Sequence, residues 1–168
     1  MPGWCESAAL TVNGQAAESR AAAGSYVVIE RDWKPGNVVA LDLPMPARPT
    51  APHPQIDALR GSLAIERGPL VYCLEEIDQE PGLNLAAVRI SPASALRPTW
   101  RGDLLGGVTT IEAEGALADL TGWAEHLYRP QGAAEAAAPH RAATLTAVPY
   151  YAWANRGPGK MRVWLPVG

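Results

Sequence analysis

Acidic side chains gather in the middle of the chain, where two of them could act as a carboxylate pair in acid–base chemistry. Hydrolysis of a glycosidic bond uses such a pair, with the two groups roughly 5 to 10 Å apart across the scissile bond. Glu75 and Glu76 are neighbours in a predicted strand, so their side chains point to opposite faces. The stretch Glu76-Ile-Asp-Gln-Glu80 is typical of a solvated strand end and loop. We therefore predict no catalytic residue in this group, which consists of Glu66, Glu75, Glu76, Asp78 and Glu80.

Cysteine and histidine are too few and too scattered to indicate a metal centre. Zinc takes about four ligands, usually from clustered Cys and His, whereas none of the three histidines belongs to a ligand-spaced pair. We predict no bound metal and no other cofactor. Cys73 lies in an apolar run and is interpreted as a small buried core residue. A disulfide between Cys73 and Cys5 stays open, because spacing alone does not decide it.

One glycine-rich stretch, Arg156-Gly-Pro-Gly-Lys160, looks superficially like a phosphate-binding loop. Pro158 removes a backbone donor, and the spacing of a P-loop does not follow. A tight turn between two strands is the favoured interpretation, because glycine supplies the unusual φ values that such turns need.

Six tryptophans stand against no phenylalanine. An indole ring can stack on a sugar, but it also brings a large apolar area to a core or an interface. Trp153 and Trp164 lie in predicted core strands. Trp100 and Trp123 lie in loop-like stretches and are the candidates for sugar stacking at the surface.

Composition narrows the class of protein. The 168 residues are 48% hydrophobic, which argues against disorder, and only 18% charged, which suggests that part of the surface packs against something else. The net charge of -3 with no run of Lys or Arg argues against nucleic-acid binding. No apolar run reaches the roughly 20 residues of a membrane helix, so no membrane partner is expected. The first residues lack the pattern of a secretory signal. A missing N-terminal part would carry any targeting information, so the localisation stays open, with a cytoplasmic protein favoured over a secreted one.

Frequent glycines and prolines, 16 of each, predict an all-β chain with many turns. Asn13-Gly14 is a strong hairpin signal, since both residues tolerate positive φ. Residues 70–75 are apolar on both faces, which predicts a central strand covered on both sides. The only helix-prone patch, residues 133–138, is expected to be a loop or a single helical turn. Other strands are expected at residues 8–13, 25–30, 37–43, 62–66, 86–91 and 107–112, and as a last pair at 141–151 and 160–167, with turns at 33–36 and 104–107.

Five prolines within residues 44–54 make this stretch the best candidate for a linker. We place a domain boundary near residue 50, although an ordered crossover between two sheets stays open. Residues 1–50 would then be a partial β-sandwich that continues strands from a missing N-terminal part. Residues 51–168 would be a complete C-terminal β-sandwich.

Several motifs resemble one family in both type and order. They are Pro2-Gly-Trp-Cys5, Val12-Asn-Gly14, Leu41-Asp-Leu-Pro-Met-Pro46, Glu66-Arg-Gly-Pro-Leu-Val-Tyr-Cys-Leu-Glu75 and the stretch from Pro149-Tyr-Tyr-Ala-Trp to Val163-Trp-Leu-Pro166. The chain resembles the C-terminal, non-catalytic region of glycoside hydrolase family 127, which includes β-L-arabinofuranosidases and was long catalogued as a domain of unknown function. The resemblance covers most of the chain and is weakest over residues 117–138.

The resemblance implies an accessory role rather than catalysis. The family's zinc-bound cysteine nucleophile and glutamate acid/base lie in a preceding helical barrel with adjacent cysteines, and this chain has no Cys-Cys pair. No catalytic residue is therefore carried over. We expect an all-β, antiparallel, jelly-roll-like sandwich that supports the helical catalytic domain or mediates dimerisation. The alternative is a carbohydrate-binding module that uses exposed tryptophans.

Overall fold

The computed structural model describes residues 1–17, 22–123, 126–128, 130 and 141–168. It divides into two compact units, Met1–Pro46 and Ala47–Gly168. The division falls inside the proline-rich stretch, four residues before the predicted boundary. The helix-prone patch at 133–138 lies outside the described residues. All the described helices are short 3-10 turns, and every ladder of the two sheets is antiparallel, so the all-β antiparallel class is confirmed.

The first unit contains a three-stranded sheet in the order β2-β1-β3, whose bounds are β1 Ala9–Val12, β2 Gln15–Ala16 and β3 Val39–Asp42. The predicted Asn-Gly hairpin joins β1 to β2: Asn13 and Gly14 have φ of 52° and 78°. The Asn13 side chain also accepts a hydrogen bond from the Val38 amide at 2.9 Å, which holds β3 beside the hairpin. Asparagine thus closes the turn and positions the next strand.

Residues 25–30 do not belong to a strand, so the prediction of a strand there is wrong. The run has the β-branched residues of a strand, but within the described residues it has no ladder partner. The predicted turn that follows does form: the Asn37 amide donates to the Lys34 carbonyl at 3.1 Å, and Gly36 has a φ of 89°. β-Propensity alone therefore did not supply a partner strand.

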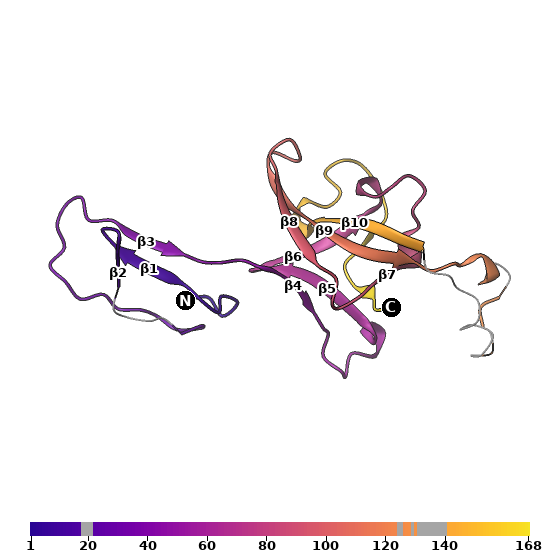
Figure 1. Cartoon of the computed structure of the whole chain (residues 1–168), viewed down its shortest axis with the longest axis horizontal. Helices are drawn as coiled ribbons and strands as arrows, with labels where there is room; N and C mark the ends of the chain where they lie inside the picture. The colour runs from indigo at the N-terminus through magenta and orange to yellow at the C-terminus, as the bar shows by residue number, and fades with distance from the viewer. Residues whose placement is uncertain (18–21, 124–125, 129, 131–140) are drawn as a thin grey trace. The chain divides into compact units, whose positions relative to one another are not determined.

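The second unit is built on one nine-stranded sheet, whose main path runs β12-β5-β6-β10-β9-β7 (Figure 1). Off this path, β4 pairs with β5, β8 with β9, and β11 with β6. The strands are β4 Ala47–Thr50, β5 Ser62–Arg67, β6 Leu70–Glu75, β7 Val88–Ile90, β8 Leu96–Arg101, β9 Val108–Leu117, β10 Arg141–Pro149, β11 Met161–Arg162 and β12 Leu165–Pro166. The 3-10 turns are η1 Asp57–Leu59, η2 Glu76–Asp78, η3 Leu85–Ala87, η4 Thr121–Trp123 and η5 Tyr150–Ala152.

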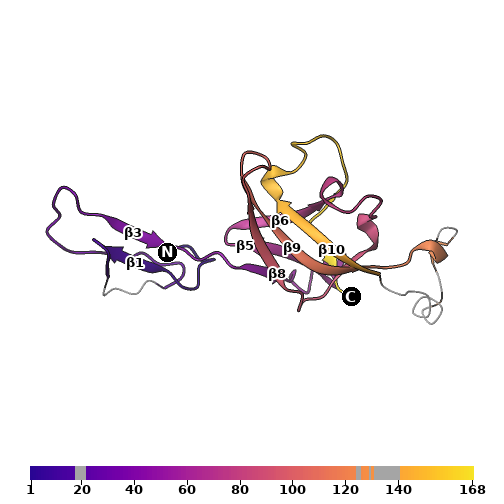
Figure 2. The same ribbon diagram turned by 45° about the horizontal axis from the view of Figure 1, so that its top comes forward.

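The sheet is strongly curled, as Figure 2 shows from a second side, and its two ends meet. Ile90, in β7, and Val167, just after β12, form an isolated parallel bridge, and the Gly168 amide donates to the Ile90 carbonyl at 3.3 Å. The two layers expected for a sandwich are therefore parts of one continuous, curled sheet. Curling covers strand edges that would otherwise be open to a second chain.

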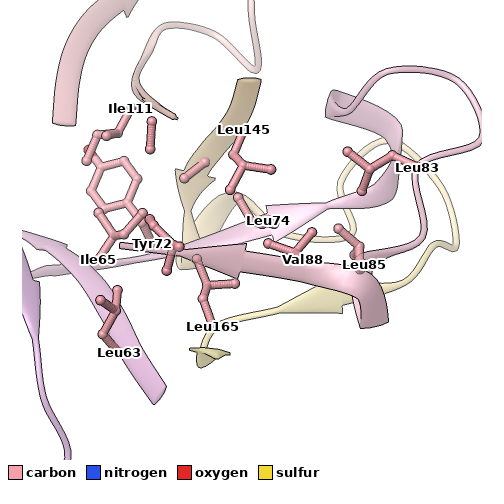
Figure 3. Close-up of a cluster of buried hydrophobic side chains, with 13 residues drawn as sticks. Leu63, Ile65, Tyr72, Leu74, Leu83, Leu85, Val88, Ile111, Leu145 and Leu165 are labelled. Atoms are coloured by element: carbon pink, nitrogen blue, oxygen red, sulfur yellow. The ribbon is translucent and has the colours of Figure 1, made fainter. Parts of the chain in front are cut away.

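The core fills the inside of this curl (Figure 3). Tyr72 and Leu74 project into it from β6, which lies between β5 and β10, so the prediction of a central strand at 70–75 is confirmed. The rest of the cluster comes from β5, β7, β9, β10 and β12, from η3 and from the connection that precedes it. It consists of Leu63, Ile65, Leu83, Leu85, Val88, Ile90, Ile111, Ala113, Leu145, Ala147 and Leu165.

Gly115 in β9 is required by close packing. A Cβ added there would lie 2.4 Å from Cδ1 of Leu145 and 2.9 Å from the Arg89 carbonyl oxygen. Glycine inside a strand often marks such a close approach.

Three local predictions need correction. Residues 47–50 form β4 rather than a linker, pairing with β5. The stretch around Trp100 was predicted to be loop-like, but it forms β8, which pairs with β9. β8 contains Pro98, and an edge strand tolerates proline. The expected last pair does not form either. Leu74 of β6 pairs with Ala147 of β10 and with Arg162 of β11, so these two strands lie on opposite edges of β6, and the chain between them crosses the end of that strand.

Candidate functional site

The end of β6 carries a carboxylate that lies inside the protein. The side chain of Glu75 is only 5% exposed, whereas its neighbour Glu76, which begins the 3-10 turn η2 just after the strand, is exposed. Asp78 follows in η2, and its side chain is 9% exposed. The prediction of a solvated strand end and loop covered residues 76–80, and it is wrong for Asp78. Burying two carboxylates this close together is costly unless a cation accompanies them.

Arg156 supplies that cation from the crossing segment. Its Nη1 and Nη2 donate to both Asp78 oxygens, at 2.5 and 2.6 Å, and Nη2 also donates to Oε2 of Glu75 at 2.6 Å. The fork geometry of a guanidinium suits such bidentate binding. Hydrogen bonding to Asp78 raises the pKa of Arg156, so it is charged at every accessible pH. The residues Glu75, Asp78 and Arg156 are called the ion-pair cluster below.

Two further residues, Ala154 and Gln79, help to hold the segment after β10 and the end of β6 in place. Oε1 of Glu75 accepts a hydrogen bond from the Ala154 amide at 3.0 Å. The Gln79 amide donates to the carbonyls of Glu75 and Thr146, both at 2.8 Å, and accepts from the Thr146 amide at 3.2 Å. Gln79 thus replaces a missing strand partner beside β10. The carboxylates are saturated by protein donors, an arrangement suited to holding a loop in place.

The anchored segment presents aromatic side chains to solvent. Tyr150, Tyr151 and Trp153 are all substantially exposed, Tyr151 at 64%. The rings of Tyr150 and Trp153 stack, with centroids 6.0 Å apart and an angle of 23° between their planes. The Asn155 side chain donates to the Ala152 carbonyl at 3.0 Å and closes the loop. We call residues 150–153 the aromatic loop. The prediction that Trp153 belongs to a core strand is wrong, because the chain turns into η5 after Pro149.

The two candidate sugar-stacking residues lie far apart. Trp100 is in β8 opposite Thr109, near the start of β9, and is 67% exposed. Its ring packs on Gly107, where an added Cβ would lie 2.7 Å from the indole. Trp123 is partly buried in η4, beyond the other end of β9. At about 3.3 Å per residue, the strand between them spans roughly 26 Å. The two rings do not form one platform.

Neither cysteine takes part in a disulfide: both Cys5 and Cys73 are buried free thiols. Cys73 is a buried strand residue, as predicted. Burial raises its pKa to about 11, and the nearby carboxylates of the ion-pair cluster add to this effect. The thiol is therefore protonated at neutral pH and is a poor nucleophile.

Neither a metal-binding cluster nor a membrane-spanning helix is present among the described residues. Across the described ranges, no group of three or more His, Cys, Asp and Glu side chains could hold a metal ion. Within the same ranges, no helix is long and apolar enough to cross a membrane.

Sequence reasoning missed the ion-pair cluster and the aromatic loop. Arg156 stands 78 and 81 positions from its two partners, and no local pattern connects them. The single signal was a basic residue, Arg156, at the start of a glycine-rich stretch that we interpreted as a turn.

The second unit is a curled antiparallel β-domain in which Arg156 pairs with the carboxylates of Glu75 and Asp78. Comparison with known proteins shows which family it belongs to. The family model "Glycoside hydrolase family 127 C-terminal domain" matches residues 47–166. The model "Beta-L-arabinofuranosidase, GH127 middle domain" matches residues 1–45. The chain belongs to glycoside hydrolase family 127.

Individual relatives agree with this assignment. A non-reducing end β-L-arabinofuranosidase of Bifidobacterium longum subsp. longum is 35% identical over 98% of this chain, which spans 25% of that protein. A solved glycoside hydrolase has a TM-score of 0.89 at 36% identity, with 100% of this chain and 27% of that one covered. A GH127 β-L-arabinofuranosidase from Geobacillus stearothermophilus T6 has a TM-score of 0.83 at 37% identity, with 100% and 26% covered. The chain thus spans about a quarter of the length of its relatives.

Proposed function

We propose that this chain is the non-catalytic C-terminal region of a β-L-arabinofuranosidase-type glycoside hydrolase, and that it supports a catalytic domain in the rest of that protein. One observation carries the proposal. The whole chain matches about a quarter of the length of a solved glycoside hydrolase, and it fits the middle and C-terminal domain models of the family. The locked carboxylates of the ion-pair cluster agree with it, since a hydrolytic pair must face the scissile bond.

The first unit fits the role of a partial sandwich better than that of a free domain. Among its described residues, the buried apolar side chains are Cys5 and Val12. Both strands at the edges of its sheet, β2 and β3, are exposed throughout. We propose that the first unit, residues 1–46, continues strands of a middle domain that begins before Met1, while residues 47–168 form the C-terminal domain.

The aromatic loop is our candidate for the surface that meets the rest of the protein. Exposed aromatic groups held on a rigid support are typical of interfaces, where they bring a large area at little entropic cost. The ion-pair cluster provides that support through Ala154 and Arg156. The carbohydrate-binding alternative has less in its favour, because the matched domains are hydrolase domains and Trp100 and Trp123 lie apart. Dimerisation through the same loop would show as a dimer of the full-length protein.

An activity assay tests the proposal. The purified 168-residue chain should release no aglycone from an aryl β-L-arabinofuranoside, while the full-length protein does so under the same conditions. Turnover by the chain alone, lost on substitution of a residue within it, would contradict a non-catalytic role. Replacing Tyr151 with Ser in the full-length protein should lower its melting temperature more than the same change does in the isolated chain.

A further inference from the structure

Residues 25–30 of the first unit have the exposure pattern of a strand. Ser25, Val27 and Ile29 are partly buried, whereas Tyr26, Val28 and Glu30 are exposed, Tyr26 at 98%. An alternation with period two is produced by an extended backbone with one face covered. Residues 25–30 therefore have the exposure pattern of a strand with one face covered, although no described strand pairs with them.

The backbone of this run is unpaired. Among the described residues, the N–H and C=O groups of residues 26–30 make no backbone hydrogen bond. An open cavity of about 710 Å³ lies along residues 28–32, between them and the β1–β2 hairpin, where Val12, Asn13 and Gln15 line it. A run of strong β-formers with free polar groups is a template for strand addition.

Met1 shows where a partner strand would come from. Its amino group donates to the Ser25 carbonyl, and the Gly24 amide donates to the Met1 carbonyl at 3.0 Å. From nitrogen to carbonyl, Met1 therefore runs from Ser25 back to Gly24, which is the antiparallel direction. Any residues before Met1 would then pass Tyr26 and continue toward Glu30. The amide of Met1 in a longer chain can donate the same hydrogen bond.

We propose that the segment immediately preceding Met1 in the full-length polypeptide forms a β-strand that pairs antiparallel with residues 26–30. This inference rests on the proposed function, by which the chain is the end of a longer protein. Alternate residues of a strand direct their polar groups to the same edge. Because the Ser25 carbonyl faces Met1, the amides of Val27 and Ile29 face the same edge and donate to the added strand.

Amide hydrogen exchange tests this pairing. In the full-length protein, the amides of Val27 and Ile29 should exchange on the order of 1,000-fold more slowly than in the 168-residue chain, because ladder amides open only with their sheet. Equal exchange in the two proteins would overturn the proposal. Protection already present in the 168-residue chain, at any concentration, would also overturn it, because the partner would then be internal or a second copy.

A proline substitution supplies a second readout. Val27→Pro removes the donor and should lower the melting temperature of the full-length protein but not that of the 168-residue chain, where this amide is unpaired. Val27→Thr, which keeps both the donor and β-branching, is the matched control and should leave both proteins unchanged. An equal drop in both proteins after Val27→Pro would overturn the pairing.

If the full-length variant does not fold, amide hydrogen exchange in the unsubstituted protein still decides whether the strand pairs. Exchange is independent of catalysis, so a full-length protein without hydrolase activity would refute the proposed function and leave this test intact.

Discussion

The two units of this chain solve the problem of burial in opposite ways. The second unit closes a curled sheet around one contiguous cluster that includes Tyr72, Leu74 and Leu145. In the first unit the described buried apolar side chains are Cys5 and Val12, and Leu41 of β3 is exposed although it alternates as a core residue would. Burial of apolar area is the main favourable term in folding. The second unit therefore carries its own stability, whereas the first depends on contacts that the described residues do not supply.

The largest effect is expected when a substitution creates a cavity in the core of the second unit. The same kind of substitution in the first unit should have little effect. Tyr72→Ala should lower the free energy of unfolding by about 3 to 5 kcal/mol, because a large, fully buried ring is removed from a packed core. Leu41→Ala in the first unit should stay within about 0.5 kcal/mol of the parent chain, as exposed positions do. Denaturant midpoints measure both effects. Similar losses for the two variants would mean that the units do not differ as proposed.

Removing the charge of Arg156 tests how much the ion-pair cluster contributes to the stability of the second unit. Arg156→Met leaves the carboxylates of Glu75 and Asp78 buried without a cation beside them. Such a loss lowers the free energy of unfolding by about 3 kcal/mol. Arg97→Met is the control, because Arg97 pairs with Glu114 at 3.0 Å on the surface, and exposed pairs contribute about 1 kcal/mol or less. Thermal unfolding should separate the two variants clearly. An Arg156 variant as stable as the Arg97 variant would argue against the ion-pair cluster as an anchor.

A single added methyl group tests how closely β9 is packed beside β7. Gly115→Ala should destabilise the second unit by about 1 to 3 kcal/mol, because its Cβ would overlap Leu145 and the Arg89 carbonyl. Gly3→Ala in the first unit meets no atom within 4 Å and should be close to neutral. Chemical denaturation of both variants checks this prediction, which fails if the Gly115 variant unfolds at the midpoint of the unsubstituted chain.

The smallest effect expected concerns the two thiols. Cys5 should react faster than Cys73 with iodoacetamide under native conditions, because a unit with little core opens more readily. Burial raises the pKa of Cys73 to about 11 in the folded chain. Its contribution to stability is therefore complete below the ordinary thiol value of about 8.5 and is lost as the pH rises toward 11. Mass spectrometry of each labelled peptide across this pH range gives the rates, and equal rates for both thiols would remove the distinction between the units.

Local chemistry allowed much of the fold to be predicted. Asn13-Gly14 closed a hairpin because both residues accept positive φ, and the doubly apolar run at 70–75 became the central strand. The all-β class and the family followed from similar short patterns and motifs. Each of these features depends on residues close together in the chain, so their order along the chain was enough to predict them.

Tertiary structure alone decided the partners. Residues 25–30 have strand composition but no described partner, β8 accepts Pro98 because only one of its edges is paired, and the chain after β10 crosses β6 instead of turning back. The pairing of Arg156 with Glu75 and Asp78 joins positions about eighty residues apart. A sequence pattern records which backbone conformation and face a residue prefers. It does not record which distant group will be brought within hydrogen-bonding distance, since that depends on how the whole sheet curls.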